Sequence, residues 1–330
     1  MVMISDGIEK PLACWRGKER YDNGLLDCLT IIFKTAGCSW SRCRMCSYRN
    51  ERYEKQSVES LTNHLRRQLS WVMAQYPPED YRMIKIFTSG SFFDPEEVPP
   101  IFQSEVATAF RGKIVVAETR PEFVESETLN RFIEGIDDGS YALPVYCAIG
   151  LETTNDDIRE KCIDKGFTFS AFVRAASIAH TARAGVKAYL LFKPLFLTEG
   201  EAVCDMRSSI AEASQYADLI SMNPCTVQRR TELEKYWREG SYRPPYLWSV
   251  LSILADSPVY VACDPLGGGQ RRGPHNCGKC DYEIVKGIRD YTQNGDQDLI
   301  CALLDTDCSC KAEWEYVLAH EQPYAMPLTR

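Results

Sequence analysis

The chain alternates short apolar segments, which read as strands, with longer segments of helical periodicity. Such alternation with short connections predicts a mostly parallel sheet covered by crossover helices. Six strand–helix units are compatible with either an open doubly wound sheet or a partial barrel. The strands are expected at about 29–35, 83–87, 113–117, 144–151, 187–192 and 218–222, and the helices between them at about 55–76, 97–111, 123–135, 169–184 and 200–215.

Polar side chains follow the predicted strands at the points where the strands end. Ligands gather at the carboxyl ends of parallel strands in both barrels and open sheets. We therefore expect these side chains to share one active-site face. In chain order they are Ser89, Gly90 and Ser91, then Glu118 and Arg120, Glu152, Lys193 and Asn223.

A loop after the first predicted strand holds three closely spaced cysteines, Cys38, Cys43 and Cys46. Clustered thiolates are typical ligands of iron–sulfur clusters and soft metals. A structural zinc ion usually takes four ligands. Three local cysteines therefore favour a four-iron cluster that leaves one iron open. A zinc site that borrows a distant fourth ligand is the alternative.

The pattern of the chain changes after about residue 225. We expect a lead-in over 1–27, a strand–helix domain over 28–225 and a mostly helical extension over 226–330. Two cysteine pairs in the extension resemble a four-cysteine zinc site, with an auxiliary iron–sulfur cluster or unligated thiols as alternatives. The pairs are Cys277 with Cys280 and Cys308 with Cys310, and His275 and Cys263 are possible substitute ligands.

Charge and hydropathy limit the partners. The 330 residues carry a net charge of −8, which argues against non-specific nucleic-acid binding over the whole surface. No run of 18 apolar residues and no export signal is evident, so we expect a cytoplasmic protein with no membrane segment. Local basic spots remain available for phosphate contacts: Arg229, Arg230, Arg243, Arg271 and Arg272.

The first cysteine loop resembles the signature of the radical S-adenosylmethionine (SAM) superfamily, with Met45 before the last cysteine. The superfamily usually spaces its cysteines by three and two residues, whereas here the first gap is four. The resemblance implies a partial (β/α)6 TIM-type barrel, a [4Fe–4S] cluster on Cys38, Cys43 and Cys46, and SAM on the open iron.

The same resemblance assigns roles to the strand-end residues. It implies cofactor binding by Ser89, Gly90, Ser91, Glu118, Glu152 and Asn223, and catalytic roles for Glu118, Arg120, Glu152 and Lys193. For the carboxylates, a simple charge at a helix start is the alternative.

Several longer segments are similar to the radical SAM subunit of archaeal archaeosine synthase, which is related to the Elp3-type class. They are 88–95, 118–122, 150–156, 165–168, 242–249 and 272–281. The family acts on position 15 of tRNA, where a lysine-transferring partner subunit first attaches lysine to 7-cyano-7-deazaguanine. The radical SAM subunit then cleaves the lysine carbon–nitrogen bond and leaves archaeosine.

This resemblance implies three partners: tRNA, the lysine-transferring subunit and an electron donor. Tyr242, Tyr246 and Trp248 are candidates to stack on a base, although core packing is an equal alternative. Two other functions stay open. One is a radical SAM enzyme acting on another nucleoside or a small molecule, and the other is a zinc-stabilised RNA-binding protein without catalysis.

Overall fold

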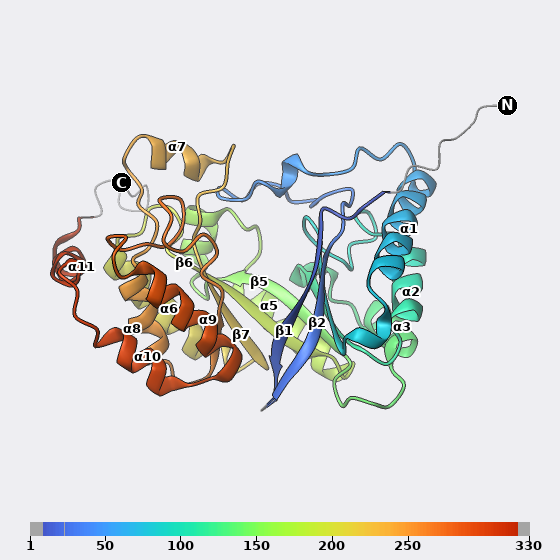
Figure 1. Cartoon of the computed structure of the whole chain (residues 1–330). Helices are drawn as coiled ribbons and strands as arrows, with labels where there is room; N and C mark the ends of the chain where they lie inside the picture. Colours follow the sequence, from blue (N-terminus) through green and yellow to red (C-terminus); the bar gives the residue numbers. More distant parts are fainter. Residues whose placement is uncertain (1–8, 23, 323–330) are drawn as a thin grey trace. The chain divides into compact units, whose positions relative to one another are not determined.

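The computed structural model describes residues 9–22 and 24–322 (Figure 1). They divide into two compact units. The first contains the described residues up to Ser41, together with Tyr48–Ala148 and Ser177–Gly185. The second contains Arg42–Ser47, Ile149–Ala176 and the described residues from Val186 onward. The cysteine loop thus begins in the first unit and ends in the second.

The strands of the first unit start with a hairpin. Strand β1 (Ala13–Tyr21) pairs antiparallel with β2 (Gly24–Ile32), and β3 (Met83–Phe87) and β4 (Ile114–Thr119) then add in parallel. The register places Ile31 opposite Ile86, and Ile86 opposite Ala117, all fully buried. Strand β1 was not expected, because it is an exposed, charged strand whose residues lack an apolar face.

Three α-helices cover these strands: α1 (Val58–Gln75), α2 (Pro100–Ala109) and α3 (Ser126–Ile136). Ser57 caps α1 in a reciprocal capping box with Ser60, and Pro77 follows its end. Leu61 and Leu65 bury the apolar face of α1. Short 3-10 helices η1 to η3 occupy Tyr48–Asn50, Pro78–Asp80 and Pro121–Phe123.

In the later part of the chain, strand β5 (Val145–Glu152) is followed by α4 (Asp156–Ile158), the π-helix η4 (Arg159–Ile163) and α5 (Phe169–Thr181). Strands β6 (Gly185–Phe192), β7 (Leu219–Pro224) and β8 (Val261–Cys263) pair in parallel, and α6 (Glu199–Ala213) connects the first two.

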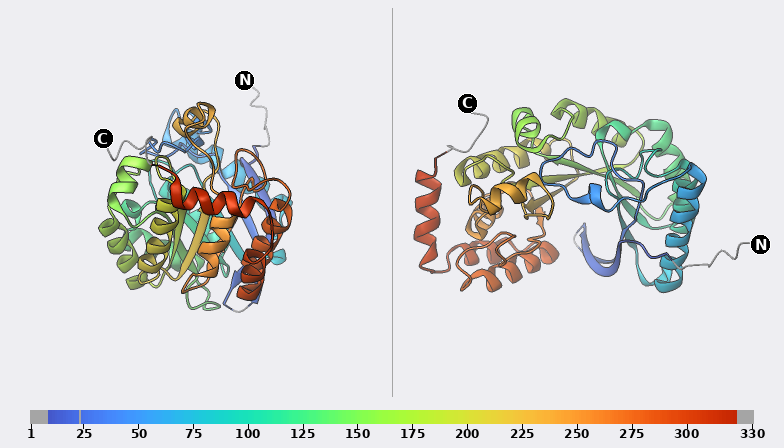
Figure 2. Two further views of the ribbon diagram at one scale, coloured as in Figure 1. Left: turned by 90° about the vertical axis from the view of Figure 1, so that its left-hand side faces the viewer. Right: turned by 90° about the horizontal axis from the view of Figure 1, so that it is seen from above.

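The extension after β7 is mostly helical. It contains α7 (Glu232–Arg238), α8 (Leu247–Ala255), α9 (Asp281–Asn294), α10 (Gln297–Leu304) and α11 (Cys310–His320). Helices α9 and α10 pack on α8, and α11 packs on α6 (Figures 1 and 2). Helix α7 was not expected, because its residues Glu-Leu-Glu-Lys-Tyr-Trp-Arg give only two turns and a weak apolar pattern.

The strand order decides between the two predicted architectures. The strands lie in the sheet in chain order, from β1 to β8. A doubly wound sheet reverses its order of strand addition, whereas a barrel wall does not. The six predicted strands are β2 to β7, and the predicted α/β partial-barrel class is confirmed. None of the helices in the described part of the chain is long and apolar enough to cross a membrane.

Candidate functional site

The Ser89-Gly90-Ser91 loop leaves the carboxyl end of β3 and lies against the first cysteine. A Cβ atom at residue 90 would come 2.6 Å from Cys38 Cβ and 2.7 Å from Cys38 Cα. Only glycine fits such an approach without displacing the neighbouring backbone. The structure therefore brings Gly90 and Cys38 together, as expected for residues at one site.

A carboxylate that the sequence did not single out holds this loop in place. Glu97 is 1% exposed, and its two oxygens accept hydrogen bonds from the Ser89 and Ser91 amides at 3.0 and 2.7 Å. The Thr35 hydroxyl donates a third bond, at 2.6 Å. Burial raises the pKa of Glu97 to about 7, although these donors oppose the rise. Only its neighbours in space mark this residue, so no sequence pattern could have found it.

The residues after β4 contact the same loop. The Glu118 carboxylate accepts from the Thr88 amide at 3.2 Å, and the Arg120 amide donates to Ser91 Oγ at 2.9 Å. The Arg120 side chain is buried, binds Glu122 at 2.5 Å and lies 5.5 Å from the Trp40 ring centroid. Five predicted site residues, Ser89, Gly90, Ser91, Glu118 and Arg120, are thus gathered in the first unit.

The other two cysteines of the loop lie in one turn of the second unit. The Cys46 amide donates to the Cys43 carbonyl at 3.3 Å, and both side chains are half-buried. Residues around the turn anchor it: the Arg44 amide donates to the Ile163 carbonyl at 3.0 Å, and the Ser47 amide to Gln228 Oε1 at 2.7 Å. A fixed turn with two half-buried thiols suits the binding of an iron–sulfur cluster.

Glu152 and Lys193 end their strands in the left-handed region, with φ of 68° and 59°. Lys165 donates to Glu152 Oε1 at 2.6 Å. Lys193 is 3% exposed and forms an ion pair at 2.7 Å with the fully buried Glu199. The sequence missed both partners, since each is distant from a strand end. Asn223 lies at the end of β7, half-buried.

The four C-terminal cysteines converge on one point. Their sulfur atoms all lie within 4.8 Å of one another. Four of the sulfur–sulfur distances are 4.0 Å for Cys277–Cys280, 3.7 Å for Cys277–Cys308, 3.7 Å for Cys280–Cys310 and 3.4 Å for Cys308–Cys310. Thiolates about 2.3 Å from a tetrahedral ion lie about 3.8 Å apart. The group therefore has the geometry of a site for one metal ion.

Hydrogen-bond donors surround these sulfurs. Trp248 Nε1 donates to Cys310 Sγ at 3.2 Å, and Asn276 Nδ2 to Cys280 Sγ at 3.4 Å. The Lys279 backbone amide is the largest of the influences that lower the pKa of Cys277 to about 7. Such donors stabilise thiolates and orient metal ligands. Cys263 and His275, considered above as substitute ligands, do not belong to this group of four cysteines. Cys263 is buried in β8, and His275 Nδ1 is hydrogen-bonded to the Gly273 carbonyl.

The predicted stacking surface is core instead. Tyr242, Tyr246 and Trp248 are 8%, 3% and 0% exposed. The Tyr242 hydroxyl donates to the Lys193 carbonyl at 2.8 Å, and the Tyr246 hydroxyl to Glu313 at 2.8 Å. A Pro-Pro-aromatic segment buries its rings because it opens the apolar helix α8. The alternative of core packing, weighed from the sequence, is the observed one.

Fold and site define an α/β partial-barrel protein with two separate groups of cysteines, one of which has the geometry of a metal site. No family model matches the chain. The archaeosine synthase subunit beta of Methanosarcina acetivorans is 39% identical over 334 residues, covering 97% of this chain and 93% of that protein. The protein of the same name from Thermococcus kodakarensis is 37% identical over 306 residues, covering 88% of this chain and 91% of that protein. The chain belongs to the archaeosine synthase subunit beta family, and the resemblance inferred from its motifs is confirmed.

Two solved structures are similar at lower identity. Elp3 of Methanocaldococcus infernus, lacking its N-terminal residues 1–46, matches 72% of this chain and 59% of its own, with 14% identity and a TM-score of 0.46. A queuine lyase from Clostridium spiroforme, bound to SAM and queuine, matches 71% of this chain and 90% of its own, with 17% identity and a TM-score of 0.46.

Proposed function

We propose that this protein is a radical SAM enzyme that completes archaeosine on tRNA. In this proposal it cleaves the lysine carbon–nitrogen bond of the adduct at position 15. The observation that carries the proposal is the close approach of Gly90 to Cys38, which ties the strand-end loop to the cysteine loop. The name of the relatives, archaeosine synthase subunit beta, supports the pathway and implies a partner subunit.

Cys38, Cys43 and Cys46 are the residues that would hold a [4Fe–4S] cluster. Their donor chemistry fits it, because three thiolates leave one iron for SAM. When bound, the cluster and SAM supply a 5′-deoxyadenosyl radical that abstracts a hydrogen atom from the substrate. An external electron donor is required, and a reducing cytoplasm, the proposed location, keeps cysteine thiols reduced.

In this proposal the chain's own residues position the cofactor. The small Ser89-Gly90-Ser91 loop lets the backbone approach the methionyl group, and Glu97 fixes its amides. Glu118 and Arg120 lie against the same loop and offer opposite charges for the amine and carboxylate of SAM. Glu152 and Asn223 are proposed ribose or substrate contacts. Lys193 forms an ion pair with Glu199, so we propose that it positions neighbouring residues and does not itself contact the substrate.

The four C-terminal cysteines are proposed to bind one zinc ion. Four sulfurs within 4.8 Å of one another leave room for a single ion, whereas a cluster spreads its thiolates over several irons. Such a closed site would join the loop at Cys277 to the start of α11. Chemistry is then confined to the first loop.

The test is a single-turnover reaction. Reconstituted protein is incubated anaerobically with SAM, a reductant and lysine-adducted tRNA, and the nucleosides are analysed by mass spectrometry. The formamidine nucleoside and 5′-deoxyadenosine are expected in equal amounts. Deoxyadenosine without the formamidine would favour another substrate. Neither product, from protein that contains zinc alone, would favour the non-catalytic RNA-binding alternative.

A further inference from the structure

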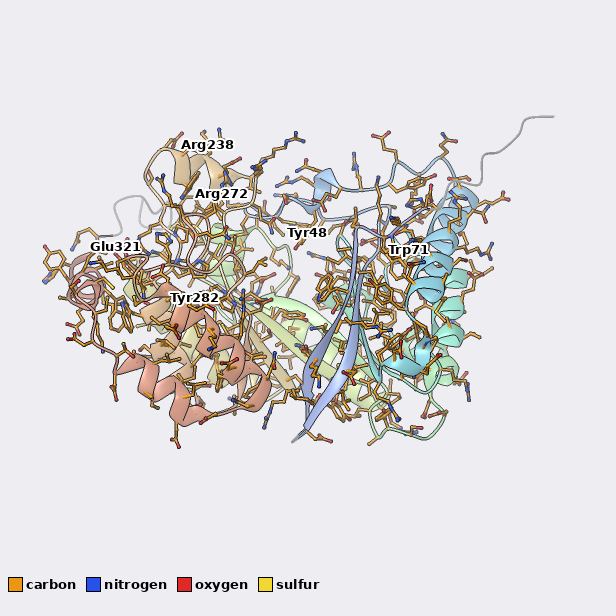
Figure 3. All side chains as sticks on the ribbon, in the orientation of Figure 1. Tyr48, Trp71, Arg238, Arg272, Tyr282 and Glu321 are labelled. Atoms are coloured by element: carbon orange, nitrogen blue, oxygen red, sulfur yellow. The ribbon has the colours of Figure 1, made fainter. Side chains whose placement is uncertain are left out.

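A cluster of cations lies on α7 and on the two segments beside it in the second unit. We call it the α7 surface. Figure 3 shows two of its members, Arg238 and Arg272, close together. The surface consists of Arg229, Arg230, Lys235, Arg238, Arg271 and Arg272. All but Arg272, which is half-buried, are exposed.

Hydrogen bonds hold the two segments side by side. The Val227 amide donates to the Arg272 carbonyl at 2.7 Å, and Arg272 Nη1 returns a bond to the Val227 carbonyl at 3.0 Å. Thr226 Oγ1 donates to the Leu266 carbonyl at 2.9 Å. Arg229, two residues after Val227, and Arg271, next to Arg272, therefore belong to one surface although 42 positions separate them.

The acidic residues of α7 that face this surface are already neutralised. Glu234 binds Arg238 at 3.0 Å and also pairs with Arg272. The Arg230 amide, which donates to Glu234 at 2.7 Å, is the main reason that the pKa of this carboxyl is lowered. Arg44 binds both oxygens of Glu232, at 2.9 and 2.7 Å.

The remaining cations have no such partner. Arg229, Arg230, Lys235 and Arg271 form no ion pair with any described residue. In a chain with a net charge of −8, uncompensated positive charge gathered here creates a local field that attracts anions.

The surface is also pre-organised. Arg230 adopts a left-handed φ of 60°, a conformation that is unfavourable in a residue other than glycine. The hydrogen bond from the Arg230 backbone amide to the Glu234 carboxylate stabilises this conformation. The Arg272 guanidinium lies 4.6 Å from the Trp237 ring centroid, which limits its orientation. The downstream segment continues into Cys277, so the four-cysteine group fixes its far end.

We propose that the α7 surface binds the phosphate backbone of the tRNA substrate, an inference that rests on the proposed function. RNA is favoured over an acidic protein segment because a nucleic acid carries a negative charge at every phosphate, which suits cations spread over three stretches of chain. The contacts give affinity and orientation, not sequence recognition.

The test uses the full-length protein and an unmodified tRNA transcript. Arg229→Glu with Arg271→Glu is compared with Lys286→Glu plus Arg289→Glu, two exposed cations of α9 outside the surface. The first pair should weaken binding roughly tenfold at ~0.1 M salt and reduce the slope of log K against log salt by about 1.5. The control pair, which changes net charge equally, should leave both unchanged. Arg229→Lys with Arg271→Lys should keep most of the affinity.

Equal losses in both charge-reversed proteins, or no loss in the first, would overturn the proposal. It would also fail if the first pair abolished association with the partner subunit but kept tRNA binding. An assay of SAM cleavage in the absence of RNA distinguishes a failure of this proposal from a failure of the proposed function. The Arg229 and Arg271 variant should cleave SAM as the native protein does, whereas a native protein that cleaves no SAM would refute the function and leave the RNA-binding result standing.

Discussion

The two cysteine groups differ in how the chain supports them. The C-terminal four come from one unit, their sulfurs all lie within 4.8 Å of one another, and Trp248 and Asn276 donate hydrogen bonds to two of them. The N-terminal loop offers three cysteines on a segment that passes from one unit to the other, with Gly90 pressed against the first. A complete set of four ligands suits a structural ion, whereas an incomplete set leaves a coordination position for chemistry.

The largest effect is expected at the N-terminal loop. Changing Cys38, Cys43 and Cys46 together to Ala should reduce SAM cleavage to the uncatalysed background, because no ligands for the cluster remain. Anaerobic assays of 5′-deoxyadenosine formation would measure this. Cys204→Ala, which removes an exposed thiol outside both groups, should keep full activity. Residual cleavage in the triple variant would contradict the division of roles.

At the C-terminal group, we expect a loss of stability. Cys280→Ala should release the bound ion and leave three sulfurs unligated. The loss of a structural metal site should lower the free energy of unfolding by about 2–4 kcal/mol, which for a chain of this length lowers Tm by roughly 3–6 °C. Metal analysis and thermal unfolding would measure it, with the exposed Cys301→Ala as control. An unchanged Tm together with lost metal would show that the ion has no structural role.

Gly90→Ala tests the contact between the strand-end loop and Cys38. The added methyl group would lie 2.6 Å from Cys38 Cβ, so the loop must move. The KM for SAM should rise about tenfold, equivalent to about 1.4 kcal/mol of lost binding. Gly17→Ala is the matched control, since nothing lies within 4 Å of a Cβ there. Equal kinetics for the two variants would show that the contact is not needed.

A smaller effect is expected at Glu97. Glu97→Gln places an amide donor against the Ser89 or the Ser91 backbone amide, which leaves that amide without its acceptor. The change should lower the free energy of unfolding by about 1–3 kcal/mol. In the native protein the pKa of Glu97 is raised to about 7, above its value of 4.5 when unfolded. The folded state therefore binds more protons between these values, and stability should fall as pH rises from about 4.5 to 7.

Unfolding in denaturant across this pH range would test both statements. The fall in stability with pH should be smaller for Glu97→Gln, whose side chain does not titrate. An identical pH dependence in the two proteins would assign the titration to another group.

The sequence predicted the elements whose residues show a strong period. The helix expected at about 200–215 is found as α6, Glu199–Ala213, and the six predicted strands all form. Strand β1 was missed because Arg16, Lys18 and Arg20 give it a charged surface, and its place depends on pairing with β2.

The candidate site was predictable only in its local part. Cysteine spacing and strand-end positions identified the first loop, Ser89 to Ser91, and the C-terminal pairs. Glu97 and Glu199 each lie only six residues from Ser91 and Lys193, but nothing in the chain around them indicates those contacts. The roles of Tyr246 and Trp248 depended on burial, which a Pro-Pro-aromatic segment does not determine.

Metal content after anaerobic reconstitution tests the central claim most directly. The native protein should hold about four irons and about one zinc per chain. Replacing Cys38, Cys43 and Cys46 should remove the iron and keep the zinc, and replacing Cys277, Cys280, Cys308 and Cys310 should do the reverse. Iron that disappears with the C-terminal cysteines, or zinc that disappears with the N-terminal ones, would contradict the account.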